Sequence, residues 1–196
     1  MKTQFYKTIK VFALVLLTAC NTIYDNMPPC KVYFNFVYDK NMLYADAFHS
    51  QCDNVELFIF NQDSTFIKSA TVSGDLLKQL DYKMEVPIEV GNYIAFAWVG
   101  IENSYKLSEL KPGVSKIDDL KLKLKTESNQ IQRKKIESLW HAEPITFSFN
   151  GERNICNTLK LTRNTNTIRI GIKTINADDN IEKRSYNVKI IADNST

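Results

Sequence analysis

The sequence has 196 residues, with 25 lysines and arginines against 22 aspartates and glutamates and a formal net charge of +3. The surplus lies in residues 1–20, which hold three lysines and no acidic residue, so the rest of the chain carries 22 charges of each sign. A balanced chain has no electrostatic reason to seek a phosphate backbone, which argues against nucleic-acid binding. A chain of this length can bury one good core and is small for two full domains.

Residues 1–19 have the pattern of an export signal. Basic residues come first, the apolar run Val11–Leu17 follows, and Leu17-Thr18-Ala19-Cys20 ends the segment. The apolar run is too short to span a bilayer, and the last four residues resemble the bacterial lipobox, whose cysteine becomes the acylated first residue of the mature protein. We therefore predict a signal peptide at 1–19, lipidation at Cys20 and a tether at 20–29, with an uncleaved anchor or a chance cysteine as the alternatives. Several acyl chains would hold the protein on a membrane without a transmembrane helix.

From residue 30 onward the apolar residues recur with a period of two, which is typical of strands with one face on a core. The clearest case is Leu120–Leu124, where leucines alternate with lysines. Shorter alternations occur at Val86–Val90, Leu159–Leu161 and Ile168–Ile172, and the denser runs Val32–Tyr38, Val55–Phe60 and Tyr93–Val99 predict strands covered on both faces.

Turn sequences such as Asn61-Gln62-Asp63-Ser64 and Lys111-Pro112-Gly113 separate these runs at short intervals. About ten short strands with few helical patterns favour an all-β fold, an antiparallel β-sandwich, over a parallel α/β sheet. Two short helices are predicted, Gly74–Leu80 and Ile131–Trp140, the second after the polar run Thr126–Gln130.

Three cysteines remain if Cys20 carries lipid. Cys30, Cys52 and Cys156 permit one disulfide with one thiol left over, or three separate buried thiols, which we favour. A zinc site using Cys52 with His49 lacks further ligands at a recognisable spacing, so no metal is predicted.

Catalytic templates are absent from the sequence. Only two histidines occur, and no Gly-x-Ser-x-Gly elbow, phosphate loop or dinucleotide fingerprint is present. His141 follows Trp140 at a predicted helix end, where capping or packing is expected, and Asp178-Asp179 is expected to be a solvated turn pair. We therefore predict that the protein is not an enzyme, with no catalytic residue, no cofactor and no small-molecule substrate.

Two sets of aromatic residues are open to a structural or a sugar-stacking interpretation. Phe34, Phe36 and Tyr38 alternate on one strand face and are predicted to be core rather than a sugar platform. Trp98 lies in an apolar strand with Ile94 and Phe96 on its own face, so we expect a central strand that buries the indole between sheets.

Several short segments along some 150 residues together resemble one family. The chain is similar to the fimbrial-anchor lipoproteins of Bacteroidetes, the base subunits of the major and minor (Fim/Mfa-type) fimbriae. The matching segments are Cys20 with Ile23-Tyr24-Asp25, Pro28-Pro29-Cys30, Phe34–Asp39, Asn41–Phe48, Val55–Phe60, Gly91-Asn92-Tyr93 leading to Ala97–Gly100, Leu139-Trp140-His141, and Leu159–Asn166.

The resemblance implies two transthyretin-like β-sandwich domains that are tethered by lipid to the outer membrane and seat a fimbrial shaft, so fimbrial shaft subunits are the expected partners. On this basis residues 30–180 are the N-terminal domain. Residues 181–196, with the strand-like run Tyr186–Asn194, are the start of a second, truncated or missing domain. The expected mechanism is β-strand addition, in which a sheet edge pairs with a strand of the partner. The candidate edges are Leu120–Leu124 and the last strand.

The position of the first arginine bears on the subunit's role. Shaft subunits of such systems lose their N-terminal strand to an arginine-specific protease, whereas this chain has no arginine before Arg133. The sequence therefore favours an anchor over a shaft subunit.

Two further hypotheses stay open. Asp63-Ser64-Thr65 resembles an O-glycosylation acceptor of these bacteria, with Ser64 as the modified residue and an ordinary Asx-type turn as the alternative. The rival function is a surface glycan-binding lipoprotein, which should display a flat, exposed set of aromatic side chains.

Overall fold

The computed structural model describes residues 29–125 and 135–171. The chain divides into two compact units, Met1–Thr165 and Asn166–Thr196. The predictions for the signal peptide, Cys20, most of the tether, Thr126–Gln130, Asp178-Asp179 and residues 181–196 fall outside the described residues. Within the described ranges, no helix is both long enough and apolar enough to cross a membrane.

Strands dominate the first unit, which confirms the predicted all-β class with short helices. The short helices are one α-helix, α2 (Phe48–Gln51), and two 3₁₀ helices, η1 (Gly74–Lys78) and η2 (Ile117–Asp119). The strands are β1 (Val32–Val37), β2 (Asn54–Asn61), β3 (Phe66–Ser73), β4 (Met84–Val86), β5 (Gly91–Val99), β6 (Tyr105–Leu107), β7 (Leu122–Leu124), β8 (Trp140–Ala142), β9 (Ile145–Phe149) and β10 (Ile155–Arg163).

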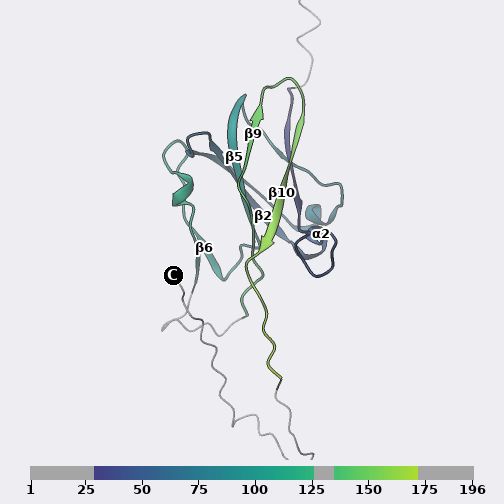
Figure 1. The fold of residues 1–196 in the computed structure, drawn as a ribbon. Coiled ribbons are helices and arrows are strands. Elements are labelled where there is room, and N and C mark those ends of the chain that lie inside the picture. The colour runs from purple at the N-terminus through teal and green to yellow at the C-terminus, as the bar shows by residue number, and fades with distance from the viewer. Residues whose placement is uncertain (1–28, 126–134, 172–196) are drawn as a thin grey trace, which may run out of the picture. The chain divides into compact units, whose positions relative to one another are not determined.

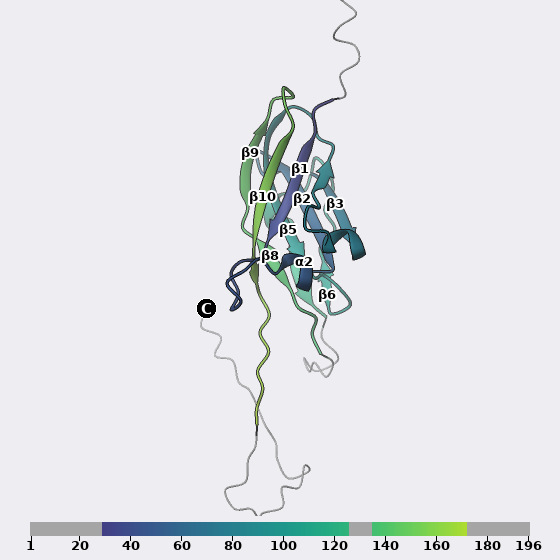
Figure 2. The ribbon, with the colours of Figure 1, turned by 90° about the vertical axis from the view of Figure 1, so that its right-hand side faces the viewer.

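Eight strands form one sheet in the order β3-β2-β5-β8-β10-β1-β4, with β9 also paired to β5. The sheet folds over on itself, so that β10, β1 and β4 pack on β3, β2 and β5 in a nearly barrel-like sandwich (Figure 1 and Figure 2). Strands β6 and β7 form a separate two-stranded ribbon.

The β1–β10 pair departs from the predicted antiparallel sheet because its two strands run parallel, from Val32↔Ile155 to Val37↔Lys160. The other strand pairs of the described residues are antiparallel. Almost the whole domain separates β1 from β10 in the chain, so no tight hairpin fixes their relative direction.

The main core lies between the two layers. Phe34, Phe36 and Tyr38 are 0%, 3% and 4% exposed, which confirms the prediction that they are core residues. Phe147 joins the layers, because its ring meets Phe34 edge-on at 5.5 Å and stacks on Tyr93 at 5.6 Å between ring centroids. Phe147 of β9 therefore links β1 of one layer to the paired strands β5 and β9 of the other.

A second, smaller core covers the outer face of β2 and β5. Phe58, Phe60 and Phe66 are buried there beneath the segment that runs from β6 to β7. Partly buried side chains complete it, namely Ile94, Phe96, Trp98, Leu107, Leu110, Ile117 and Leu120. The dense runs of β2 and β5 are therefore covered on both faces, as predicted.

The prediction that the Trp98 indole is buried between the sheets is wrong. Its strand is central, as expected, but Tyr93, Ala95, Ala97 and Val99 point into the main core, and Trp98 lies half-buried on the opposite face. The period of two separates two faces of a strand, and it does not say which of two apolar faces meets the larger core.

The predicted helix Ile131–Trp140 is wrong over its described part. Residues 135–139 are not helical and Trp140 begins β8. Trp140 pairs with Val99 on one side and Arg163 on the other. The ladder bonds available from two neighbouring strands override the local helical pattern.

The predicted strand Ile168–Ile172 does not form over its described residues. Ile168 and Ile170 are 67% and 54% exposed, and residues 164–171 have no regular structure. An alternating pattern specifies only which side chains a strand would present on each face. A strand forms only where a neighbouring strand supplies its backbone hydrogen bonds. The first predicted helix is shorter than Gly74–Leu80, since η1 ends at Lys78, and α2 was not predicted.

Candidate partner-binding surfaces

Three consecutive apolar residues are held in solvent just after β1. Met42, Leu43 and Tyr44 are 94%, 68% and 94% exposed, and we call them the apolar tip. Single exposed apolar residues are ordinary, but a contiguous set on one loop marks an interaction surface.

Hydrogen bonds fix the loop that carries the apolar tip. The Asn41 side-chain amide donates to the carbonyls of Tyr38 (2.6 Å) and Ala45 (2.8 Å), and its Oδ1 accepts from the Leu43 N–H at 2.8 Å. Tyr44 has a φ of 54°, a left-handed conformation that costs a non-glycine residue energy. The local bonds of Asn41 hold the chain in this conformation.

The base of the loop is joined to the core. One Asp46 oxygen accepts hydrogen bonds from the backbone N–H groups of Tyr38 (2.9 Å) and Phe48 (3.0 Å). Both of these residues are buried, at 4% and 1% exposure. The Asp46 carboxylate therefore anchors the apolar tip to the backbone of two residues that do not move without opening the core.

Two polar contacts connect the loop to neighbouring strands. Lys40 pairs with Glu143 at 3.2 Å and donates to the Thr162 hydroxyl at 3.4 Å, and Asp39 pairs with Lys160 at 3.9 Å. Exposed ion pairs contribute little to stability, but these contacts place the loop beside the end of β10.

The apolar tip lies at the opposite end of the domain from the start of β1. Strand β1 (Val32–Val37) starts near the top of the domain in Figure 2, and the loop that follows it lies at the lower end. Any attachment through the residues before β1 would therefore leave the apolar tip at the far end.

Strands β3 and β4 end the sheet order, and β9 pairs with β5 alone among the described strands, so each of the three has an unpaired edge. At the start of β3, the Phe66 N–H donates to the carbonyl of Ser115, and its carbonyl accepts from the Gly113 N–H, both at 2.8 Å. Residues 67–73 of β3 pair only with β2 among the described strands. This stretch is the longest of these three edges open to a further strand, since β4 has three residues and β9 has five.

The edge predicted at Leu120–Leu124 is shorter than expected. Strand β7 holds only Leu122–Leu124, the 3₁₀ turn η2 precedes it, and it pairs with β6 rather than with the main sheet. The other predicted edge, the last strand, lies outside the described residues.

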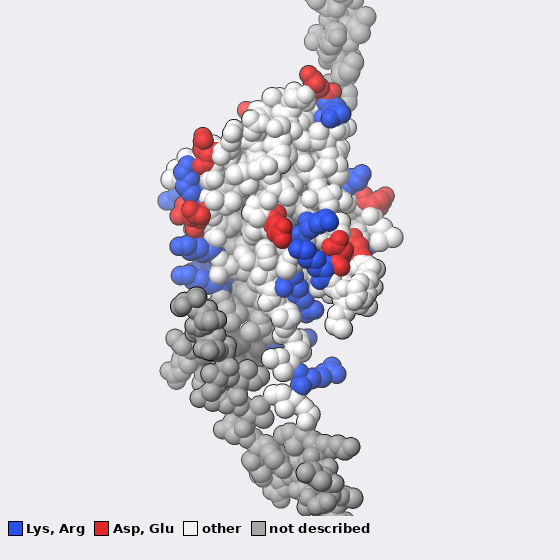
Figure 3. Space-filling view, viewed as in Figure 1, with Lys and Arg blue, Asp and Glu red and all other residues white. Residues whose placement is uncertain are grey.

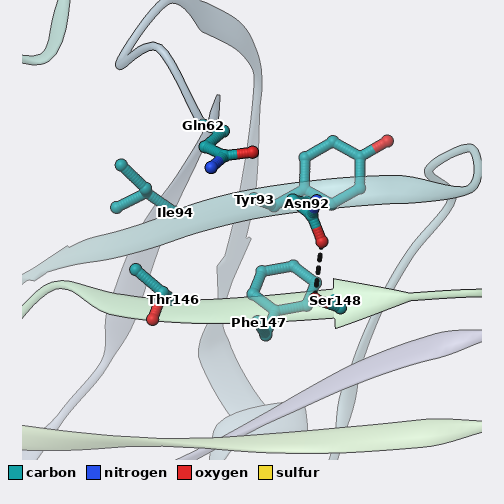
Figure 4. A pocket seen from close by; sticks show the side chains of 7 residues that line it. All are labelled: Gln62, Asn92, Tyr93, Ile94, Thr146, Phe147 and Ser148. Atoms are coloured by element: carbon teal, nitrogen blue, oxygen red, sulfur yellow. Dashed lines mark hydrogen bonds between the residues drawn. The ribbon is translucent and has the colours of Figure 1, made fainter.

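A hollow of about 440 Å³ lies over β5 and β9. Figure 4 shows its amide and hydroxyl side chains, with Ser148 donating to Asn92 Oδ1 at 2.6 Å. Such groups can hydrogen-bond sugar hydroxyls, but the two aromatic rings at the hollow, Tyr93 and Phe147, stack on each other. Tyr93 is only 8% exposed, so its ring is not free to stack on a sugar.

The three described cysteines differ in exposure and form no disulfide with one another. Cys52 is buried, Cys30 is half-buried and Cys156 is exposed, so the prediction of three buried thiols is correct only for Cys52. Burial raises the pKa of the Cys52 thiol to about 12. His49, the residue weighed with Cys52 for a zinc site that was not predicted, has Nδ1 2.8 Å from the carbonyl oxygen of Leu77.

His141 and Ser64 occupy structural positions. His141 Nδ1 lies 2.8 Å from Asn164 Oδ1, and the ring centroids of His141 and Trp98 are 6.0 Å apart. Ser64 is in an Asx-type turn, since Asn61 Oδ1 accepts from the N–H groups of Asp63 (3.0 Å) and Thr65 (2.8 Å). The turn predicted as the alternative is thus present, and modification of Ser64 stays a prediction.

Sequence reasoning missed the apolar tip. Residues 41–48 matched the resembling family as a segment, but nothing in their period distinguished the exposed Met42, Leu43 and Tyr44 from core residues. The available signal was the pair of turn-forming residues, Asn41 and Asp46, that enclose three apolar residues.

Residues 24–196 match the family described as Mfa2, fimbrillin-A associated anchor proteins Mfa1 and Mfa2. The minor fimbrium anchoring subunit Mfa2 of Porphyromonas gingivalis is 24% identical over 189 residues, which cover 92% of this chain and 56% of that protein.

Two solved structures share the fold. A candidate polysaccharide-binding protein of Bacteroides thetaiotaomicron aligns with a TM-score of 0.67 at 42% identity, over 68% of this chain and 47% of that one. The fimbrial anchor protein Mfa2 of Porphyromonas gingivalis aligns with a TM-score of 0.58 at 18% identity, over 69% of this chain and 50% of that one. The chain spans about half the length of these relatives.

Proposed function

The chain belongs to the family of fimbrillin-A associated anchor proteins, and from that premise we propose that it holds a fimbrium at the outer membrane. The family is one of structural anchor subunits rather than enzymes. The proposal has two parts, a lipid tether at one end of the domain and a contact with fimbrial shaft subunits at the other.

The membrane attachment is the lipid on Cys20. The supporting observation is the lipobox-like Leu17-Thr18-Ala19-Cys20 after a basic, apolar leader. An N-terminus kept at Cys20 fits the lack of any arginine before Arg133, because an arginine-specific protease would have no site near β1. N-terminal sequencing of protein exposed to such a protease tests this part, and a new N-terminus within residues 21–60 would contradict it.

The partner contact centres on the apolar tip, and this surface carries the proposal. Met42, Leu43 and Tyr44 are kept exposed on a loop whose conformation is already fixed, so little ordering entropy opposes their burial in a partner. Full burial of a large apolar side chain contributes about 1.5–3 kcal/mol. A few such anchors dominate the affinity of an interface.

Strand addition would supply the backbone part of the contact. The open edge at residues 67–73 of β3 can give a partner strand its main-chain hydrogen bonds, while side-chain pockets give specificity. Lys68 lies on this edge strand, and its Nζ donates to the Pro87 carbonyl at 2.9 Å. Edge lysines commonly prevent unwanted pairing.

A triple substitution tests the partner contact. Replacing Met42, Leu43 and Tyr44 with serine should weaken capture of fimbrial shaft subunits by roughly tenfold or more. A control with serine at Leu80, Val90 and Val114, which are 85%, 66% and 70% exposed, removes a similar apolar surface elsewhere. Equal capture by the two variants, with equal melting temperatures, would remove the apolar tip from the interface.

The second candidate function is surface glycan binding. It is favoured by the polar hollow over β5 and β9 (Figure 4) and by the 42% identical relative described as a candidate polysaccharide-binding protein. It is weakened by the lack of a free aromatic ring at the hollow. A glycan array with the wild type and with the Asn92→Ala/Ser148→Ala variant decides between the two candidate functions. The variant should lose signal only if the hollow over β5 and β9 binds a glycan.

Two finer assignments complete the proposal. Residues 30–180 form the N-terminal domain and residues 181–196 begin a second β-domain, as the resemblance implies. Ser64 carries an O-linked sugar on the turn between β2 and β3, where bulk would cost no core packing. An intact-mass measurement equal to that of the lipidated polypeptide alone would contradict the glycan.

A further inference from the structure

The β6–β7 ribbon gathers lysines on one of its faces. Lys106 lies directly across from Lys123 in the strand register. Two backbone bonds continue the pairing beyond the strands, from Ser108 N–H to the Lys121 carbonyl (2.9 Å) and from Lys125 N–H to the Ser104 carbonyl (2.8 Å). Lys121, Lys123 and Lys125 therefore alternate onto one side, together with Lys106, and we call this set the lysine face.

The lysine face carries an electrostatic cost. Like charges directly opposite each other across two strands are destabilising. The four side chains are exposed, and the ion pairs of the described residues use other lysines, Lys31, Lys40, Lys78 and Lys160. The repulsion between Lys106 and Lys123 is thus not relieved by a carboxylate of the described chain.

Acidic groups lie at the ends of the lysine face rather than at its middle. Glu137 lies beside Ser104 and Lys125 at one end. Asp118 and Asp119 belong to η2 at the other end, where Asp119 accepts the Lys116 N–H at 2.8 Å. Lys106 and Lys123 keep the centre positive.

The opposite face of the ribbon is fixed to the protein. Tyr105 is buried and its hydroxyl donates to the Glu137 carbonyl at 2.7 Å, while Leu107 and Leu120 pack into the smaller core. The ribbon cannot turn its lysines inward without exposing these groups. The lysine face therefore stays pointed at solvent.

The geometry selects the kind of partner. Alternate residues of a strand are about 6.6–6.8 Å apart and opposite residues about 4.5–5.5 Å, so the charges form a regular row suited to a chain with repeated anionic groups. The ammonium group of lysine is a point charge and lacks the planar, bidentate fork of arginine. A row of lysines therefore suits a ligand with many charges along its length better than a single anion of fixed shape. Figure 3 shows blue side chains over this part of the molecule.

The location of the ribbon argues against a bilayer as the partner. Figure 1 places β6 at the lower end of the domain, away from the start of β1. We propose that the lysine face binds an acidic polysaccharide, one that carries carboxylate or sulfate groups along its chain. The choice of a polysaccharide over a bilayer rests on the proposed lipid tether before β1, whereas the charge of the lysine face does not, and the lysine face is a different surface from the apolar tip.

The test compares two polymers that share one backbone. The full chain in neutral detergent should bind dextran sulfate, lose that binding as salt is raised to 1 M, and leave uncharged dextran unbound. Lys106→Gln/Lys123→Gln should weaken binding at 0.1 M salt by at least roughly tenfold, the scale of two lysines near an anionic surface. The control Lys83→Gln/Lys160→Gln removes the same charge from other strands and loops and should keep near wild-type affinity.

Three outcomes would overturn the inference. They are equal weakening by the two double variants, equal wild-type binding to dextran and dextran sulfate, and tighter binding to vesicles containing phosphatidylglycerol than to dextran sulfate. The last would indicate a membrane surface as the partner. Melting curves on both variants show that the fold is retained, since the four lysines are exposed.

Discussion

Gly100 lies so close to the backbone of Ser138 that a Cβ on this glycine would overlap the Ser138 carbonyl oxygen. Its φ of +85° is also a left-handed conformation that side chains disfavour. The close approach brings the end of β5 against the chain that enters β8. Two strands that the sequence separates widely are joined at this point.

Gly100→Ala should therefore prevent stable folding, because backbone cannot move aside as a flexible side chain can. Gly113 is the matched control, since it has a φ of +74° but nothing within 4 Å of the position that an alanine methyl group would take. Gly113→Ala should cost about 1 kcal/mol from the backbone conformation alone. Thermal melting compares them, and similar melting temperatures would contradict the close approach at Gly100.

Trp140 should matter more to stability than Trp98. Trp140 is 3% exposed, meets Tyr38 edge-on at 5.8 Å and has the Arg163 guanidinium 5.4 Å from its ring centroid. Trp140→Ala should cost about 3–5 kcal/mol. Trp98→Ala should cost roughly half as much, because its ring is only half-buried in the smaller core. Urea denaturation of both variants measures the two losses in the free energy of unfolding. A larger loss for Trp98→Ala would support the sequence-based expectation that the Trp98 indole is buried between the sheets.

Lys123→Glu should stabilise the domain. The substitution replaces the like-charged pair with Lys106 by an opposite-charged pair, worth roughly 0.2–1 kcal/mol across two strands. Lys83→Glu makes the same change of charge without a facing lysine in the register and serves as the control. A rise in melting temperature specific to Lys123→Glu, smaller at high salt, is expected, whereas no difference between the variants would show that the facing lysines do not interact.

The cysteines should react in the order of their exposure. At pH 8 an alkylating reagent should modify Cys156 first and Cys52 only after denaturant is added, because the Cys52 thiol is buried and its pKa is raised to about 12. Mass spectrometry of partly labelled protein reads out the order. Rapid labelling of Cys52 in the folded protein would contradict its burial.

The Cys52 thiol should also make the stability of the fold depend on pH. The folded chain keeps the Cys52 proton up to about pH 12, whereas an unfolded chain loses it near the ordinary value of 9.0. The free energy of unfolding should therefore be unaffected by this group below pH 9 and fall as pH rises from about 9 to about 12. Cys52→Ala should show a shallower fall over this range, and an identical fall would assign the effect to other groups.

Cys20→Ala should release the protein from membranes. Acyl chains contribute about 0.8 kcal/mol for each buried methylene, so their removal eliminates the proposed attachment. Carbonate-washed membranes from cells that express each form provide the measurement, with Cys156→Ala as the control because that thiol is exposed on the folded domain. Retention of the Cys20 variant in the washed membranes would show that the lipid is not the anchor.

The sequence by itself determined the fold class and the positions of four long strands, β1, β2, β5 and β10, but it missed the eight-residue strand β3. Dense apolar runs located β1, β2 and β5, and alternation located the part of β10 around Leu159 and Leu161. Alternation is informative because an extended chain separates apolar and polar side chains onto opposite faces whatever its neighbours are. It also identified Phe34 and Phe36 as core, since alternate apolar residues on one strand must share an environment. The family resemblance came from the order of short segments rather than from any one of them.

The tertiary structure alone decided which apolar groups are buried. Trp98 and Trp140 both lie in apolar surroundings along the chain, but pairing of β8 with β5 and β10 places Trp140 in the main core and leaves Trp98 on the outer face. Ile168 and Ile170 alternate with other residues in the same pattern as the apolar residues of a strand, and yet both are exposed. Burial depends on which segments meet in space, and local periodicity carries no information about distant partners.

The candidate surfaces depended on the tertiary structure in the same way. Met42, Leu43 and Tyr44 have the composition of core residues, and only the hydrogen bonds of Asn41 and Asp46 hold them outward. The lysines of β7 were visible as an alternating run, but only the register with β6 set Lys123 against Lys106. A sequence specifies the charge and polarity of each side chain, while the distances between them, which decide binding, exist only once the strands have paired.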